Sequence, residues 1–201
     1  SAATTITSST IADVLEIVQN TGSVFTTATN YAVTLSDATI SAANVKLINA
    51  DNGTGTIDIS AATTITSSTI ADVLEIVNNT GSTFTTATNY AVTLSDTSAS
   101  AANLNTINAD TTGLVTATNV TTISSSTFAD VNTLISNRGI SGNAINIDND
   151  YNVTLSDVSI SAANIKVVNN DTSGTINISA ATTITSSTIA DVLEIVQNTG
   201  S

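Results

Sequence analysis

Repetition is the feature of this sequence that most limits how the chain can fold. The twenty residues TTITSSTIADVLEIVQNTGS occur at positions 4–23 and recur unchanged at positions 182–201. A third copy, at positions 63–82, differs only in having Asn78 where the first copy has Gln19. Internal periods of about 20–50 residues are typical of folds in which each repeat is stabilised by stacking on its neighbours. The sequence therefore predicts an array of stacked repeats.

A short motif, called the anchor below, marks every repeat. It consists of a hydroxyl residue, then Ile or Leu, then a second hydroxyl residue, and its central residues are Ile6, Leu35, Ile65, Leu94, Ile123, Leu155 and Ile184. These central residues are 29, 30, 29, 29, 32 and 29 positions apart, so one repeat is about 29 residues long. Odd repeats read TTITSSTIADVLEIV and even repeats read AVTLSDATISAANVKLIN, which gives a pair of about 59 residues.

Each repeat is predicted to contain a strand at the anchor, a helix, a turn and a second strand. Thr10 and Asp13 have the spacing of a helix N-cap and its partner three residues later, and in even repeats Ser41 and Asn44 have the same spacing. Apolar residues follow Ile11 at i+3, i+4 and i+7, which places them on one face of a helix.

This order of elements predicts an α/β fold, a right-handed β/α solenoid with two short parallel strands and one helix in each repeat. We expect one continuous array over residues 1–201, with pairs at 1–59, 60–118 and 119–178 and a partial repeat at 179–201. Because open ends of a solenoid expose strand edges and apolar core, we expect the array to continue covalently or to associate end to end with itself.

The composition argues against several classes of function. The chain has three basic and sixteen acidic residues, so its net charge is −13. This charge argues against nucleic acid as a partner. No apolar run approaches the roughly 18 residues of a membrane helix, so we expect no membrane insertion. His and Cys are absent, which removes the usual pairs of nucleophile and base, and Lys46 and Lys166 are expected to be solvated. We therefore expect no enzymatic activity and no cofactor.

Structural calcium is the one metal for which the sequence offers candidate ligands, because clustered carboxylate oxygens bind this ion. Asp148 and Asp150, in the repeat lengthened to 32 residues, are the best local candidates. Other aspartates recur after the even anchors and in the turns after the even helices, at Asp37, Asp51, Asp96, Asp110, Asp157 and Asp171. The spacing does not match an EF-hand loop, and the alternative is that these residues serve turns and helix caps.

The anchors also suggest a surface. If the central residue of every anchor points inward, the flanking hydroxyl residues form two parallel columns. These columns would contain Thr5, Thr7, Thr34, Ser36, Thr64, Thr66, Thr93, Ser95, Thr122, Ser124, Thr154, Ser156, Thr183 and Thr185. Such an array resembles the flat threonine surfaces of solenoid ice-binding proteins, although Thr is frequent in strands for other reasons. Tyr31, Tyr90 and Tyr151 recur just before the even anchors, and we expect them to pack the corners.

Two phrases carry a resemblance to a known kind of repeat. Residues 32–73, AVTLSDATISAANVKLINADNGTGTIDISAATTITSSTIADV, contain a VTLSD phrase followed by a TxIxxxxxADV phrase, and the segment Asp150–Asp157 carries the VTLSD phrase again. This alternation resembles the repeats of giant secreted cell-surface proteins of marine bacteria, cyanobacteria among them, and it covers essentially the whole chain. The resemblance implies very long chains, export without a cleaved N-terminal signal, and a structural or adhesive role outside the cell.

The expected function is therefore an extracellular structural one, as part of a rod, filament or surface layer on the cell exterior. The alternative is an adhesive module that binds a glycan, mineral or ice surface through the hydroxyl columns.

Overall fold

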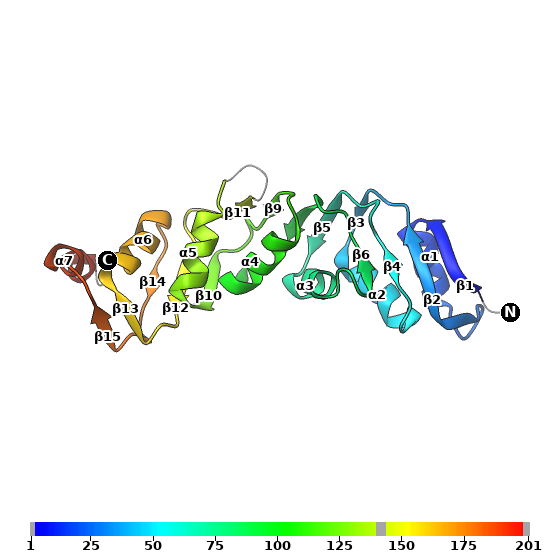
Figure 1. Ribbon diagram of the computed structural model, residues 1–201, viewed down its shortest axis with the longest axis horizontal. Coiled ribbons are helices and arrows are strands. Elements are labelled where there is room, and N and C mark those ends of the chain that lie inside the picture. The colour runs from blue at the N-terminus through cyan, green and yellow to red at the C-terminus, as the bar shows by residue number, and fades with distance from the viewer. Residues whose placement is uncertain (1–2, 140–143, 199–201) are drawn as a thin grey trace. The chain divides into compact units, whose positions relative to one another are not determined.

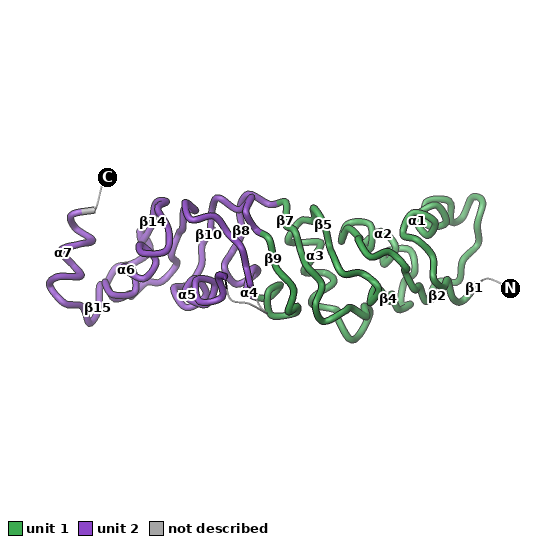
Figure 2. The backbone as a smooth tube through the Cα atoms, turned by 90° about the horizontal axis from the view of Figure 1, so that it is seen from above, with its two compact units in different colours: residues 1–95, 106–116 green, residues 96–105, 117–201 purple. Residues whose placement is uncertain are grey.

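The computed structural model describes residues 3–139 and 144–198, which form two compact units, coloured green and purple in Figure 2. Unit 1 comprises residues 1–95 and 106–116, and unit 2 comprises residues 96–105 and 117–201. Both units are α/β structures, and the strand pairs within each of them are parallel (Figure 1). The α/β prediction is thus confirmed.

The helices begin where the capping pattern predicts. Those of the described residues are α1 (Ile11–Gln19), α2 (Ala42–Asn52), α3 (Ile70–Asn78), α4 (Ala101–Asp110), α5 (Phe128–Ser136), α6 (Ala162–Asp171) and α7 (Ile189–Asn198). The Thr10 hydroxyl accepts a hydrogen bond from the Asp13 N–H at 3.3 Å and donates one to the Asp13 carboxylate at 2.6 Å. The same N-cap bond forms at Ser41, Thr69, Ser100, Thr127, Ser161 and Thr188. All the predicted caps are therefore confirmed.

Short strands alternate with these helices. They are β1 (Ala3–Ser9), β2 (Thr27–Leu35), β3 (Thr39–Ile40), β4 (Ile57–Asp58), β5 (Thr64–Ser68), β6 (Phe84–Thr85), β7 (Ala91–Leu94), β8 (Ser98–Ser100), β9 (Val115–Thr116), β10 (Thr122–Ser126), β11 (Ile145–Asn146), β12 (Asn152–Leu155), β13 (Ser159–Ser161), β14 (Ile176–Asn177) and β15 (Thr183–Thr185). Even repeats thus carry an additional strand between anchor and helix, at β3, β8 and β13, which the two-strand prediction missed. A strand of two or three residues is too short to show an alternating pattern.

In each unit, neighbouring strands are joined through a helix. Unit 1 contains a sheet of order β1-β2-β4-β6, and β9-β7-β5-β3 lie side by side in a second sheet. Unit 2 contains the orders β14-β12-β10-β8 and β13-β15. The chain leaves one strand, forms a helix and returns parallel to the first strand, so every such connection is a β–α–β crossover.

The strand register recurs at the spacing of a repeat pair. Ile6 pairs with Val33, and Val33 pairs with Ile57. The equivalent residues make the same pairs in the series Ile65, Val92 and Val115 and in the series Ile123, Val153 and Ile176. The centre of an odd anchor therefore lies opposite the residue two positions before the centre of the next even anchor. Equivalent strands consequently keep the same neighbours in each pair.

Even helices receive a second cap from the next odd repeat. The Ser68 hydroxyl accepts a hydrogen bond from the N–H of Ala42, the first residue of α2, at 2.9 Å and donates one to the Thr66 carbonyl at 2.8 Å. Ser68 is 2% exposed because β5 bulges before it, with Ser67 at a φ of +42°. Ser126 and Ser187 cap the first N–H groups of α4 and α6 in the same way, at 3.0 and 2.7 Å.

Odd helices receive the corresponding cap from the next even repeat. The carboxylate of Asp37 accepts a hydrogen bond from the N–H of Ile11, the first residue of α1, at 2.7 Å. Asp157 does the same for Phe128 at the start of α5, also at 2.7 Å. Negative charge at a helix N-terminus is stabilising, and the first-turn N–H groups have no partner inside the helix. Consecutive repeats therefore complete each other's helices.

Replacing one capping serine should lower stability without changing the fold. We expect Ser126→Ala to cost about 1–3 kcal/mol, because the Ala101 N–H then loses its partner in a buried site. Ser125→Ala is the matched control, since Ser125 is the exposed neighbour, and it should change the free energy of unfolding by less than about 0.5 kcal/mol. Urea unfolding followed by circular dichroism measures both values. Equal midpoints for the two variants would contradict this role of the serine.

Candidate functional site

Every even repeat forms a corner around a buried tyrosine. The three corners pair Tyr31 with Asp51, Tyr90 with Asp110 and Tyr151 with Asp171, and the phenol donates to the carboxylate at 2.7, 2.5 and 2.7 Å. The tyrosines are 0–1% exposed. Burial, followed by the carboxylate, raises the pKa of each phenol well above its ordinary value. These rings pack the corners, as the sequence predicts, and offer no face on which a sugar could stack.

The backbone of each corner is held as closely as the ring. The Thr111 hydroxyl donates to the Tyr90 carbonyl at 2.5 Å. A Cβ atom on Gly113 would lie 2.2 Å from that same carbonyl oxygen, so only glycine fits there. The equivalent contacts are made to Tyr31 by Asn52 and Gly55, and to Tyr151 by Thr172 and Gly174. The segment after each even helix is thus fastened to the residue that precedes the even anchor.

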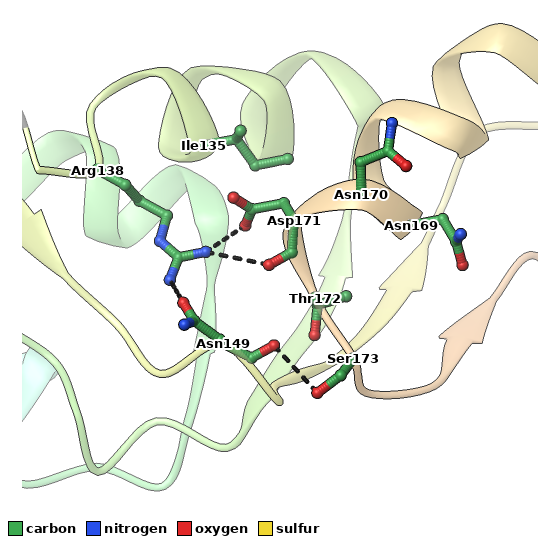
Figure 3. A pocket seen from close by; sticks show the side chains of 8 residues that line it. All are labelled: Ile135, Arg138, Asn149, Asn169, Asn170, Asp171, Thr172 and Ser173. Carbon is green, nitrogen blue, oxygen red and sulfur yellow. Dashed lines mark hydrogen bonds and ion pairs between the residues drawn. The ribbon is translucent and has the colours of Figure 1, made fainter.

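The Tyr151 corner carries an additional clamp, shown in Figure 3. Nη1 of Arg138 donates to the carboxylate and the carbonyl of Asp171, at 2.5 and 3.3 Å. Nη2 donates to the Ile147 carbonyl at 2.9 Å and to the Asn149 side chain. The guanidinium carbon lies 5.9 Å from the centre of the Tyr151 ring, within the range of a cation–π contact. Arg138 therefore cross-links the loop after α5 to the end of α6.

An open polar pocket surrounds this clamp (Figure 3). It is lined by Ile135, Arg138, Asn149, Asn169, Asn170, Asp171, Thr172 and Ser173. Its charged groups, Arg138 and Asp171, are paired with each other, and their side chains are 16% and 18% exposed. Asp171 also accepts the Tyr151 hydroxyl. Both groups are bonded to the corner, so this arrangement serves as a cross-link.

Sequence reasoning did not assign Arg138 this role, although a signal was present. Arg138 occupies the position of Thr21 and Thr80, whose hydroxyls bond the carbonyl four residues earlier. The bridges that close the following loop join Thr21 with Phe25, Thr80 with Phe84 and Arg138 with Ile145, so the third loop is three residues longer. A unique arginine that coincides with an insertion in an otherwise regular repeat was the available clue.

The candidate calcium ligands are distributed among several structural roles. Asp37 and Asp157 cap odd helices, and Asp51, Asp110 and Asp171 hold tyrosines. Asp148 and Asp150 are exposed. Within residues 3–139 and 144–198, no three acidic side chains are grouped in a way that could hold a metal ion. Helix capping therefore accounts for two of the acidic positions that the sequence singled out, and hydrogen bonds to tyrosine account for three more.

The anchors place their central residues inward in the interior repeats. Leu35, Ile65, Leu94, Ile123 and Leu155 are at most 2% exposed, whereas Ile184 is 42% exposed. The first hydroxyl residues face varied partners: Thr5 faces Ala32, Thr34 faces Asp58, Thr64 faces Thr39 and Ala91, Thr93 faces Thr116, Thr122 faces Ser98 and Asn152, Thr154 faces Asn177, and Thr183 faces Ser159. In these registers, the first hydroxyl of one anchor does not stand opposite that of another.

The second hydroxyl residue of each anchor takes part in contacts between neighbouring repeats. The carbonyls of Thr7, Thr66, Ser124 and Thr185 accept the hydroxyl of the serine two residues later. The N–H groups of Ser36, Ser95 and Ser156 donate to the carbonyls of Ser9, Ser68 and Ser126. The Thr66 hydroxyl also donates to the Ile40 carbonyl at 3.3 Å. These residues help to form the β-bulge of the odd repeats and to join neighbouring repeats.

The two lysines link an even helix to the next odd helix. Nζ of Lys46 lies 3.0 Å from Asp72 and 3.6 Å from Glu75, and Nζ of Lys166 lies 3.7 Å from Asp191 and 2.9 Å from Glu194. These carboxylates raise the pKa of both lysines. In the middle pair the lysine is replaced by Asn105 and the glutamate by Thr133. In the middle pair the lysine and the glutamate are thus replaced together, whereas the aspartate is kept as Asp130.

The chain has no significant match to any protein-family model, curated protein or solved structure. Among the helices of the described residues, none has the length and apolar character needed to cross a membrane. The repeated contacts themselves are therefore the basis for assigning a function.

The buried tyrosines should make the protein sensitive to alkali. Their folded pKa values are raised above the ordinary 10.0, so their contribution to stability is complete below about pH 10 and is lost as the pH rises above that value. The chain has three tyrosines and no tryptophan, so near-ultraviolet phenolate absorbance reports these corners alone. We expect phenolate to appear only as circular dichroism shows unfolding. Phenolate formation near pH 10 in folded protein would contradict the corner geometry.

A glycine comparison tests the close approach in the corner. Gly113→Ala should destabilise the protein by at least about 3 kcal/mol, because its Cβ would overlap the Tyr90 carbonyl. Gly81→Ala is the control: Gly81 has a φ of +80° but no atom near a Cβ, so it should cost about 1–2 kcal/mol from backbone strain alone. Thermal and urea unfolding measure the difference. A smaller loss for Gly113→Ala than for Gly81→Ala would refute the close contact.

Proposed function

We propose that this chain is a non-enzymatic structural repeat protein of the cell exterior, forming part of a rod, a filament or a surface layer. The observation that carries the proposal is the recurrence of one set of contacts between neighbouring repeats. The tyrosine corner, the serine cap and the strand register occur in equivalent positions of successive pairs. An array held by contacts between neighbours can be lengthened without redesign, which is what a structural element needs.

The proposed architecture is a right-handed β/α solenoid of repeats of about 29 residues, arranged in pairs of about 59. Parallel strands joined by a helical crossover support the handedness, since about 98% of such connections are right-handed. The pair boundaries at 1–59, 60–118 and 119–178 are supported by the equivalent registers of Val33, Val92 and Val153. The array continues covalently or through contacts with other copies.

The non-enzymatic character is supported by how the chemically capable side chains are used. The corner aspartates hold tyrosine hydroxyls, Arg138 is bound to Asp171, and the lysines pair with carboxylates of the next helix. The chain has no His or Cys, so the usual pairs of catalytic nucleophile and base are absent. No cofactor is needed for the proposed role.

The location outside the cell rests on the resemblance of the VTLSD and ADV phrases to repeats of secreted surface proteins. The net charge of −13 and the many exposed Thr, Ser and Asn side chains support it, because they favour a well-hydrated surface. The alternative, an adhesive module that uses columns of hydroxyl groups, has weaker support. The registers place some anchor threonines opposite Thr or Ser and others opposite Ala, Asp or Asn, so the regular spacing that a crystal or ice surface requires is interrupted at the latter positions.

Surface labelling of the source cells tests the proposal. Antibodies raised against the 201-residue chain should bind intact cells, and cells that lack the gene should lose a filament or layer in negative-stain electron micrographs. Antibody against a cytoplasmic protein is the control for cell integrity. Labelling that appears only after permeabilisation would overturn the exterior location. Loss of attachment with the surface layer intact would favour the adhesive alternative.

A further inference from the structure

We propose that the pocket beside Arg138 binds a neutral sugar unit through hydrogen bonds with asparagine side chains. The pocket lies within unit 2, at the Tyr151 corner, and its volume is about 680 Å³. This volume is in the usual range for sites that hold small molecules. The inference goes beyond the proposed function, because an array can serve as a structural element with or without such a site.

Departures from the repeat pattern meet at this pocket. Three of its lining residues, Arg138, Asn149 and Asn170, differ from the residues at the equivalent positions of other repeats. Those equivalent residues are, in the same order, Thr21 and Thr80, Thr29 and Thr88, and Ala50 and Ala109. The three positions are far apart in the sequence, yet their side chains line one pocket (Figure 3). This corner therefore has polar groups that the Tyr31 and Tyr90 corners lack.

The lining offers amide groups that are available to a ligand. Asn149 accepts a hydrogen bond from Arg138 through its side-chain oxygen, and its amide nitrogen donates none within residues 3–139 and 144–198. The side chains of Asn169 and Asn170 are exposed and make no hydrogen bond in that part of the chain. An amide presents a donor and an acceptor side by side, which suits two adjacent hydroxyl groups of a sugar ring.

The charges around the pocket select a neutral ligand. Each terminal nitrogen of Arg138 makes two hydrogen bonds, so the guanidinium is not free to clamp a carboxylate or a phosphate. Asp171, the one carboxylate among the lining residues that the structure describes, is paired with this arginine and leaves no free partner for a cation. Asp148 and Asp150 flank Asn149 in the chain, are exposed and repel an anion.

The clamp also fixes the wall of the pocket before a ligand arrives. Arg138 ties Asn149 to the end of α6, and the Ser173 N–H donates to the Asn149 carbonyl at 2.7 Å. Groups that are already ordered lose less conformational entropy when they bind. Ile135 adds an apolar surface for the C–H groups of a sugar ring. Because the contact is small and mostly polar, we expect a Kd on the order of 1 mM for a single sugar unit.

Nuclear magnetic resonance titration of the full chain tests the proposal. The nitrogen-15-labelled protein is titrated with the methyl glycosides of glucose, galactose, mannose and N-acetylglucosamine up to about 100 mM, roughly a hundred times the expected Kd. We expect at least one glycoside to shift the side-chain amide signals of Asn149, Asn169 and Asn170 in a saturable way. The equivalent residues of the Tyr90 corner, Asn108 and Ala109, are the internal control and should not shift. Sodium phosphate is the anionic control.

Two variants test the contacts. Asn170→Ala introduces the residue of the other two corners, and Asn149→Asp keeps the oxygen that Arg138 bonds while removing the amide donor. Each should raise the Kd of the bound glycoside about fivefold, because one hydrogen bond to the ligand is lost. Asn78→Ala, which removes an exposed amide from α3 in unit 1, is the matched control and should leave the Kd unchanged. Circular dichroism checks that every variant is folded.

Four results would overturn the sugar site. They are the absence of a saturable shift with all four glycosides, equal shifts at the Tyr90 corner, an unchanged Kd for folded Asn170→Ala, and tighter binding of phosphate at the same residues. The surface-labelling experiment is independent of these outcomes, so failure of the sugar site leaves the proposed function to be judged separately.

Discussion

The capping of each helix by the following repeat is the constraint on which the rest of this structure depends. The first N–H groups of a helix have no partner within the helix, and a buried group left unpaired is costly. Here a serine from an odd repeat completes an even helix, as Ser68 does for α2, and an aspartate from an even repeat completes an odd helix, as Asp37 does for α1. The two repeat types are therefore not interchangeable, which accounts physically for their alternation.

The tyrosine corners determine how one even repeat leads into the next element. A phenol bonded to the carboxylate twenty residues later holds the end of the even helix against the start of the even anchor. The glycine packed on the tyrosine carbonyl limits which sequences can follow the helix. Where the loop after α5 is lengthened, Arg138 ties it to the same corner, so an insertion is absorbed without loss of the recurring geometry. The corner aspartates and Arg138 thus have structural roles.

Local features of this fold were predictable from the sequence, and contacts between repeats were much less so. The helices and their caps followed from pairs such as Thr10 and Asp13, because capping depends on residues three positions apart. Strands such as β3 were missed because two residues carry no periodicity. The registers were missed because equivalent anchors were expected to stack on each other, whereas Ile65 pairs with Val92 on one side and with Ile40 of the additional strand on the other. For the aspartates, sequence spacing alone could not distinguish a cap from a metal ligand.

Neighbouring repeats stabilise each other through these contacts. The most direct test is urea unfolding, followed by circular dichroism, of chains that contain one, two, three and four copies of the 59-residue pair. Coupled repeats should unfold at rising urea concentrations as pairs are added, with the increase levelling off in the longer chains. A midpoint that is the same for one pair as for four would show that each pair folds independently, and it would contradict the account.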